Sequence, residues 1–369
     1  MLAGMMALGA MAQEGKLTVS GYYNGLGDSV RVFLVDASGE MLVQENRAIA
    51  GDKIDMTFDL KNVATLYVFG LENGQLSLEN SFSLPALPGE HAVIGGNADN
   101  FTMDGSQFYR DYHEASNLIK APQEAAQAFM RELRNNLSAG VPEAEIDKEY
   151  EEKYPALEQA LADAVLGYVK AHPDADASAM LLADLGSDTK HMKEGAALLS
   201  ERARGSLAAN MYKGILAAAE KEEASQSLQE GLEGQMAPDF TLMDINGKPL
   251  ALSSLRGKWV IIDFWGSWCG WCIKGMPKMK EYYAKYNDKL EILGVDCNDT
   301  VEKWKGAVAK HEIPWLHVYW DKDNGDNPVE LYGVQGFPTK VVVDPQGKVA
   351  KIIVGEAPSF YDYLDEVLK

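Results

Sequence analysis

Two cysteines separated by two residues are the group in this sequence best suited to chemistry. Cys269 and Cys272 enclose a Gly-Trp dipeptide, and Cys297 is the only other cysteine among the 369 residues. A C-x-x-C pair occurs in c-type haem attachment sites, zinc sites, structural disulfides and dithiol redox centres. Haem attachment requires a histidine directly after the second cysteine, but that position is Ile273.

The remaining alternatives differ in the partners and the surroundings that they require. A structural zinc site needs a second cysteine or histidine pair at ligand spacing, whereas Cys297, His311 and His317 are isolated from one another. A purely structural disulfide fits poorly between a buried strand and the start of a helix. That position is the expected context of a redox pair, so we predict dithiol–disulfide chemistry without a metal or a cofactor.

The residues on either side of the pair predict the elements that position it. The run from Trp259 to Trp265 is almost continuously apolar, which is typical of a strand buried on both faces. A helical pattern follows the cysteines through Tyr283. Further strands are expected at Leu290–Asp296, Val341–Val343 and Val349–Val354. We therefore predict an α/β domain with a mixed central sheet and flanking helices over residues 232–369.

Residues 16–105 show short alternating runs separated by turn residues, which predict a small antiparallel β domain. Residues 106–231 form a helical segment and linker, with a polar stretch at 223–236 that predicts a hinge. Three prolines mark expected helix interruptions, at Pro142, Pro155 and Pro173. The strands are expected at Lys16–Tyr23, Val30–Asp36, Ile54–Asp59, Thr65–Phe69 and Gln75–Leu84, and the helices at Glu124–Leu137, Glu143–Val169, Ser178–Leu185 and Ser206–Glu223.

Composition excludes several classes of protein. The formal net charge is −21, which disfavours binding to the phosphate backbone of nucleic acids. The hydrophobic content of 46% is that of a folded protein, and three cysteines are too few for a disulfide scaffold. The sequence contains no run of eighteen apolar residues, so no transmembrane segment is predicted. Residues 1–12 are small and apolar and end in Ala10-Met11-Ala12, which resembles a secretory signal peptide without its basic start.

Several motifs of residues 232–369 resemble those of the thioredoxin superfamily. Asp263-Phe264-Trp265, Trp268 and the two cysteines match its active-site run, and Gly336-Phe337-Pro338-Thr339 matches its cis-proline loop. The opening at Ala237-Pro238-Asp239-Phe240 is similar to extracytoplasmic thiol-disulfide oxidoreductases of the cytochrome-maturation type. Residues 16 to about 110 resemble, more weakly, the β-rich domain found ahead of such enzymes. The resemblance implies exchange of disulfides with protein substrates.

The resemblance also implies a role for each cysteine and for Asp263. Cys269 is expected at a helix N-terminus, where the helix dipole favours the attacking thiolate. Cys272, expected to be the more buried, resolves the mixed disulfide after losing its proton. Asp263 is the candidate acceptor of that proton, because burial raises the pKa of a carboxyl group. A buried structural aspartate is the alternative interpretation.

The second half of the predicted site is the proline loop and the tryptophans. A cis bond before Pro338 would bring the backbone of Phe337 and Thr339 beside the sulfurs to bind substrate, whereas the alternative is an ordinary trans turn. Trp268 and Trp271 are expected to form an exposed apolar rim for extended protein substrates, and Trp265 is expected in the core.

Three departures from the family pattern bear on the function. Gly270-Trp271 replaces the usual Gly-Pro of thioredoxins, which leaves the direction of electron flow open. Gly275 stands where cytochrome-maturation-type members often carry Glu, so Asp263 is expected to do the acid–base work. Cys297 is interpreted as a spectator, the alternative being a third thiol that traps one active-site cysteine.

Together these features predict an exported oxidoreductase of the periplasm or cell envelope, most simply a disulfide reductase recharged by a membrane electron donor. A disulfide oxidase or isomerase shares every motif. A peroxiredoxin-type peroxidase fits less well, because Cys269 does not follow the Pro-x-x-x-Thr-x-x-Cys pattern. A non-enzymatic envelope binding or scaffold protein is the alternative from a different class.

Overall fold

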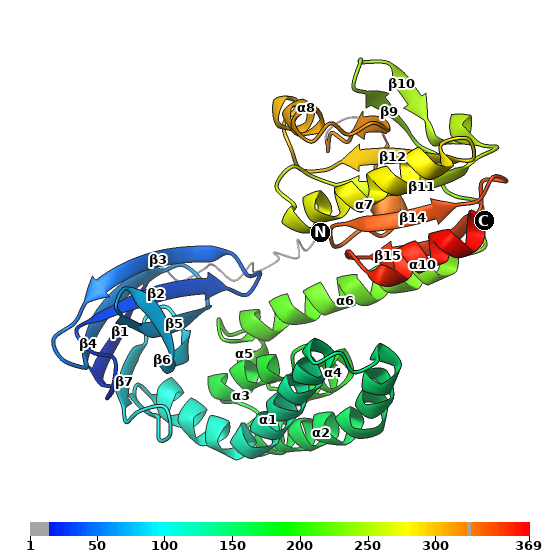
Figure 1. Ribbon diagram of the computed structural model, residues 1–369. Helices are drawn as coiled ribbons and strands as arrows, with labels where there is room; N and C mark the ends of the chain where they lie inside the picture. Colours follow the sequence, from blue (N-terminus) through cyan, green and yellow to red (C-terminus); the bar gives the residue numbers. More distant parts are fainter. Residues whose placement is uncertain (1–14, 323–325) are drawn as a thin grey trace, which may run out of the picture. The chain divides into compact units, whose positions relative to one another are not determined.

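The computed structural model describes residues 15–322 and 326–369. The chain divides into two compact units, one ending at Glu220 and the other running from Lys221 to Lys369 (Figure 1). Residues 1–12, where the sequence predicts a signal peptide, lie outside the described residues. Among the helices described, none is long and apolar enough to cross a membrane.

The N-terminal unit begins with two four-stranded sheets, in the orders β4-β1-β7-β8 and β3-β2-β5-β6. Period-two alternation produces them. In β4, Ile54, Met56 and Phe58 are buried while the intervening Asp55 and Thr57 face outward. The eight strands are β1 (Gly15–Tyr22), β2 (Ser29–Asp36), β3 (Met41–Ala48), β4 (Lys53–Leu60), β5 (Ala64–Glu72), β6 (Gln75–Ala86), β7 (His91–Gly95) and β8 (Thr102–Gly105).

Helices follow the sheets, and their buried side chains join those of the strands in one hydrophobic cluster. Pro155 was expected to interrupt a helix, but it lies inside α2, and Pro122 lies inside α1. A proline removes one backbone hydrogen bond, and in these two long helices the neighbouring turns keep the remainder. The elements are α1 (Gln107–Ser138), α2 (Glu143–Ala171), α3 (Asp176–Leu181), the 3-10 turn η1 (Leu182–Leu185), α4 (Thr189–Leu198), α5 (Glu201–Arg204) and α6 (Ala209–Leu232).

The stretch expected as a hinge is helical over most of its length. Helix α6 runs without interruption to Leu232. Six of the ten residues at 223–232 are glutamine, glutamate or leucine, whose helical preferences outweigh the polarity of the stretch and the single Gly231. Polarity alone therefore indicated solvent exposure here and not a break in the chain.

The C-terminal unit contains the predicted mixed sheet, with seven strands in the order β10-β9-β13-β12-β11-β14-β15. Strand β11 lies between β12, to which it is parallel, and β14, to which it is antiparallel. The strands are β9 (Thr241–Asp244), β10 (Pro249–Ala251), β11 (Trp259–Trp265), β12 (Leu290–Asp296), β13 (Leu316–Tyr319), β14 (Thr339–Val343) and β15 (Val349–Val354). The helices are η2 (Leu252–Leu255), α7 (Gly270–Tyr286), α8 (Val301–Lys310), α9 (Pro328–Leu331) and α10 (Pro358–Val367).

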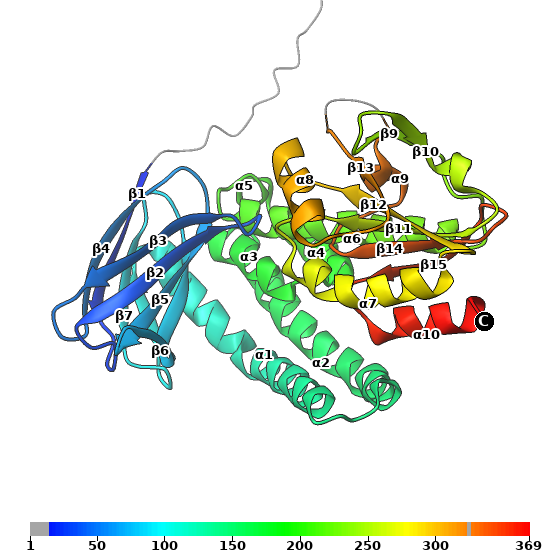
Figure 2. The same cartoon turned by 45° about the horizontal axis from the view of Figure 1, so that its top comes forward.

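The two faces of this sheet pack into separate hydrophobic clusters. Ile261 and Trp265 of β11 face the layer that contains α7 and α10, while Ile262 and Phe264 belong to the opposite cluster. Because side chains alternate along a strand, Asp263 lies on the same face as Ile261 and Trp265. In Figure 2, α7 and α10 lie side by side along this sheet. The one charged residue of β11 is therefore buried beneath the helix that carries the cysteines.

Gly294 gives a test of how tightly this sheet face is filled. A Cβ at position 294 would lie 2.7 Å from Nδ1 of His317 and 3.1 Å from Nε1 of Trp265. We expect Gly294→Ala to lower the free energy of unfolding by about 1–3 kcal/mol, because both rings are buried. Gly306→Ala is the control, since its Cβ in α8 would meet nothing within 4 Å. Chemical denaturation would measure both, and equal stability of the two variants would contradict the expected crowding.

Candidate redox site

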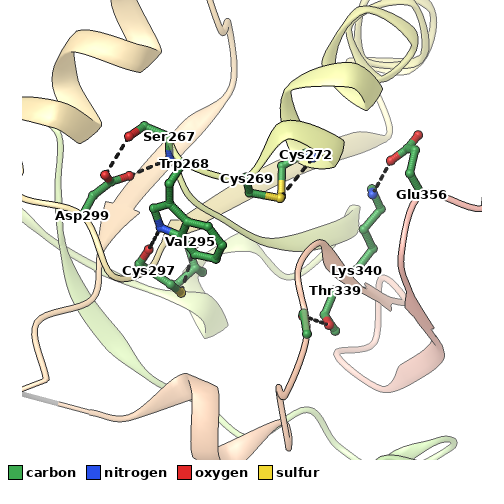
Figure 3. The surroundings of a disulfide bond; sticks show 11 residues. Ser267, Trp268, Cys269, Cys272, Val295, Cys297, Asp299, Thr339, Lys340 and Glu356 are labelled. Atoms are coloured by element: carbon green, nitrogen blue, oxygen red, sulfur yellow. Dashed lines mark hydrogen bonds and ion pairs between the residues drawn. A yellow bond between two sulfur atoms is a disulfide. The ribbon is translucent and has the colours of Figure 1, made fainter. Parts of the chain in front are cut away.

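The site lies where β11 passes through a short turn into α7. Cys269 is the N-cap residue of α7, and its Sγ forms a disulfide with Sγ of Cys272 (Figure 3). The backbone amide of Cys272 donates a hydrogen bond to Sγ of Cys269 at 3.1 Å. An amide of the first helical turn therefore points at this sulfur, as the helix N-terminus requires for a stabilised thiolate.

The turn before the cysteines is tied to the end of β12. The amide and the hydroxyl of Ser267 donate to the carboxylate of Asp299 at 2.6 and 2.7 Å, and Nε1 of Trp268 donates to the carbonyl of Cys297 at 3.0 Å. Gly266 is required here, because a Cβ would lie 2.4 Å from the Trp268 ring nitrogen. These contacts fix where α7 begins and therefore where Cys269 lies.

The proline loop contacts this turn through an aromatic pair. The Phe337–Pro338 peptide bond is cis. The Phe337 ring meets the Trp268 ring edge to face, with 5.2 Å between their centroids. Residues from two distant parts of the chain, the CxxC turn and the loop before β14, are thereby brought together.

The two tryptophans beside the sulfurs are exposed, at 52% for Trp268 and 62% for Trp271, whereas Trp265 is fully buried. The Nζ of Lys274 lies 4.5 Å above the centre of the Trp271 ring. Two large apolar surfaces and one adjacent positive charge are therefore presented next to the disulfide. Thr339 is fully buried and its hydroxyl donates to the Gly336 carbonyl, while the contact of its backbone with substrate stays a prediction.

Burial does not distinguish the two cysteines as expected. Their exposed fractions are 5% for Cys269 and 4% for Cys272 in the disulfide-bonded protein. Their positions relative to α7 differ instead: Cys269 caps the helix, and Cys272 lies in its first turn.

Asp263 is 3% exposed, and its Oδ1 has no hydrogen-bond partner among the described residues. Burial raises the pKa of this carboxyl group to about 6; the positive charge of Lys340 opposes the rise and the negative charge of Glu356 adds to it. A carboxyl group that titrates near pH 6 can exchange a proton with a thiol close to neutrality. Asp263 thus has the property that an acid–base group beside the dithiol needs.

A second acidic group lies at the end of β12 and was not identified from the sequence. Burial and the nearby charge of Asp299 raise the pKa of Asp296 to about 9, so Asp296 is protonated at neutral pH. Burial, together with Asp296, raises the pKa of the Cys297 thiol well above its usual value. Such a thiol is seldom ionised, which favours the interpretation of Cys297 as a spectator.

Three further polar residues near the dithiol were also missed: Lys340, Glu356 and Tyr361. Lys340 is 1% exposed and lies 2.8 Å from Oε2 of Glu356. The Tyr361 hydroxyl donates to Oε1 of Glu356 at 2.6 Å. A lysine inside an apolar strand, two residues after Pro338, was the one signal that could have marked this cluster. Within the described ranges, no group of three histidine, cysteine or acidic side chains is arranged to hold a metal ion.

Comparison with known proteins finds relatives of this chain. Residues 234–352 match the model of the AhpC/TSA family. The chain is 34% identical over 166 residues to the thiol-disulfide oxidoreductase ResA of Bacillus cereus, covering 45% of this chain and 88% of the relative. It is 32% identical over 136 residues to ResA of Bacillus subtilis, covering 36% and 74%. The solved thioredoxin domain of a Bacteroides vulgatus thiol-disulfide oxidoreductase is 31% identical, with a TM-score of 0.34, covering 37% of this chain and 98% of that domain.

The fold and the disulfide at the start of α7 define a thioredoxin-like oxidoreductase domain. The similarity to relatives covered over most of their length is more specific. The chain belongs to the ResA family of thiol-disulfide oxidoreductases.

The raised pKa of Asp263 predicts a pH dependence of stability. The folded pKa of about 6 lies above the ordinary value of 3.8, so the folded protein holds the Asp263 proton more tightly than the unfolded chain does. The folding stability that this proton contributes is complete below about pH 4 and is lost as pH rises through 6. Asp263→Asn cannot ionise. Its free energy of unfolding should therefore improve relative to the unsubstituted protein by up to about 3 kcal/mol between pH 4 and pH 7.

Denaturant titrations of the oxidised protein at pH 4 and pH 7 would measure this difference. Asp288→Asn, at an exposed position in the same unit, is the control and should show no comparable gain. A constant difference between Asp263→Asn and the unsubstituted protein at both pH values would show that burial does not raise this pKa.

Proposed function

We propose that this protein is an exported disulfide reductase that acts on extracytoplasmic proteins through Cys269 and Cys272. The observation that carries the proposal is the disulfide at the first turn of α7, with an amide directed at Sγ of Cys269. We assign the redox chemistry to residues 232–369. The apolar segment at residues 1–12 supports export to the periplasm or cell envelope, and a membrane protein is the expected electron donor.

In the proposed cycle the reduced protein starts with a Cys269 thiolate. The thiolate attacks a substrate disulfide, forms a mixed disulfide and releases the first substrate sulfur as a thiolate. Cys272 then transfers its proton to Asp263 and attacks Sγ of Cys269. This step forms the Cys269–Cys272 bond and releases the second substrate sulfur. Two electrons have passed to the substrate, and an external dithiol donor restores the reduced pair.

Two further features support recognition of a protein substrate beside the sulfurs. The exposed indoles of Trp268 and Trp271 offer apolar surface to an unfolded or extended segment. Phe337, held against Trp268 next to Pro338, places its backbone at the same edge of the site. We propose that the backbone of Phe337 pairs with the substrate chain while the indoles contact its side chains.

The reduction potential decides the direction of electron flow. We expect a value close to that of thioredoxin, about −270 mV, because the proposed cycle passes electrons from the dithiol to the substrate. Tryptophan fluorescence in graded thiol buffers would measure it, since Trp268 and Trp271 flank the disulfide. A value near about −120 mV would identify a disulfide oxidase or isomerase instead. Absence of a two-electron transition would rule out redox chemistry at this pair.

Substitution of single cysteines tests the two assigned roles. We expect Cys269→Ser to abolish disulfide reduction, because the attacking thiolate is gone. Cys272→Ser should keep the attack but accumulate a mixed disulfide with the substrate, which mass spectrometry of the non-reduced complex would detect. Cys297→Ser is the matched control and should retain activity. Trapping of substrate by Cys269→Ser through Cys272 would reverse the assignment, and inactivity of Cys297→Ser would give the third thiol a role.

A further inference from the structure

The structure contains a buried ion pair beside the dithiol that the proposed cycle does not use. Lys340 lies in β14, and Glu356 lies between β15 and α10. Their side chains are 1% and 14% exposed, and Nζ of Lys340 is 2.8 Å from Oε2 of Glu356. Figure 3 shows the two side chains facing each other close to the start of α7. Burying a lysine is costly, so its surroundings show what compensates it.

Lys340 lies beside Asp263 on the neighbouring strand. The two residues are direct partners in the antiparallel pairing of β14 with β11. Side chains at directly opposed positions lie on the same face with their Cβ atoms about 5 Å apart. The ammonium group therefore shares the α7 face of the sheet with the Asp263 carboxyl group. At this distance and in this degree of burial, a unit charge acts strongly on the ionisation of its neighbour.

The Glu356 carboxylate also lies beside Lys340 and packs against α7 at Gly275. A Cβ at Gly275 would lie 2.3 Å from Oε2 of Glu356, so the carboxylate occupies space that any other residue at 275 would fill. Gly275 follows Cys272 by three residues and lies within one helical turn of it. The Tyr361 hydroxyl donates to Oε1, while Lys340 binds Oε2. Both carboxylate oxygens are thus held in place by different elements.

We propose that Lys340 and Glu356 are positioning residues that set the ionisation of Asp263 with opposite signs. Lys340 favours the Asp263 carboxylate, the form that accepts the Cys272 proton, and Glu356 limits that effect. The inference rests on the proposed role of Asp263 in the cycle. It extends that role by naming the two charges that decide the pH at which Asp263 accepts a proton.

The other titratable groups around Asp263 leave its own titration distinguishable. In the oxidised protein, the two cysteines of α7 do not titrate. From β13, His317 has its pKa lowered to about 4 by burial, and from α10, Tyr361 has its pKa raised by burial. At the end of β12, the pKa values of Asp296 and Cys297 are raised, the first to about 9. Around Tyr361, Lys278 lies over the ring, and Tyr282, hydrogen bonded to Asp365, packs beside it.

The experiment is a titration of carboxyl-labelled aspartate in the oxidised full-length protein, followed by carbon-13 NMR and assigned with Asp263→Asn. Relative to the unsubstituted protein, Lys340→Met should raise the Asp263 midpoint, and Glu356→Gln should lower it, each by roughly one pH unit. The double variant should lie above the unsubstituted protein but below Lys340→Met, because the charge of Lys340 outweighs that of Glu356. A structural role would not move the midpoints in opposite directions.

An exposed ion pair in the same unit supplies the control. Lys351 and Glu233 are 3.8 Å apart, with side chains 47% and 37% exposed, and Lys351→Met with Glu233→Gln should leave the midpoint unchanged. Shifts of the same sign in both single variants, or no shift in either, would overturn the proposal. If a single variant does not fold, the double variant, which leaves no unpaired charge, decides the question. A midpoint at or below that of the unsubstituted protein would then refute it.

The titration does not depend on turnover, so the two proposals can fail separately. The second measurement is the acid limb of the pH profile for single-turnover reduction of a disulfide peptide. If the NMR midpoints move as expected but Asp263→Asn keeps the same acid limb, the coupling stands and the catalytic role of Asp263 fails. If Asp263→Asn removes the acid limb but the midpoints stay fixed, Lys340 and Glu356 are structural and the inference fails.

Discussion

One backbone amide aimed at one sulfur is the interaction on which this domain depends. The amide of Cys272 can reach Sγ of Cys269 only if α7 begins at Gly270, and the sequence itself contains no strong capping residue there. The helix start is imposed by tertiary contacts. Asp299 holds the amide and hydroxyl of Ser267, and the Cys297 carbonyl holds the Trp268 indole. The contacts at the end of β12 therefore determine where α7 begins.

The electrostatics of the site follow from how β11 alternates. A strand that buries both faces has no solvent-facing position for a charged residue, so Asp263 must be desolvated. Burial raises the pKa of its carboxyl group, as it does for Asp296, where the nearby charge of Asp299 raises the pKa further. Asp263 instead has a lysine as its cross-strand partner, and its pKa stays near 6. The two buried aspartates of this unit differ because of the charges placed beside them.

The parts that could be predicted from sequence are those with a local signal. The apolar run of β11 and the cysteine spacing identified the strand, the turn and the helix, and turn residues between alternating runs identified most strands of the N-terminal unit. Strand β3 was missed because its side chains are largely exposed and show no clear alternation. The Lys340–Glu356 pair was missed for another reason. Its members are 16 residues apart, and Lys340 meets Asp263 only through the pairing of β14 with β11, so the local sequence shows an unusual lysine but neither of its partners.

Gly275 leaves space on α7 for the Glu356 carboxylate. Read along the chain, Gly275 is a departure from a family pattern and removes a side chain from the helix face. In space, that face is occupied: the Glu356 carboxylate lies where the missing side chain would be, held by Tyr361 and Lys340. Because Glu356 comes from a neighbouring element, its carboxylate lies next to the buried Lys340 and pairs with it. A carboxylate on α7 itself would have to extend across the surface of the helix to reach this lysine. The absent side chain at 275 therefore makes room for the Glu356 carboxylate, whose partner Lys340 lies opposite Asp263 in the strand pairing. The reason for a glycine at this position is found in the pairing of β14 with β11 and not in the local sequence.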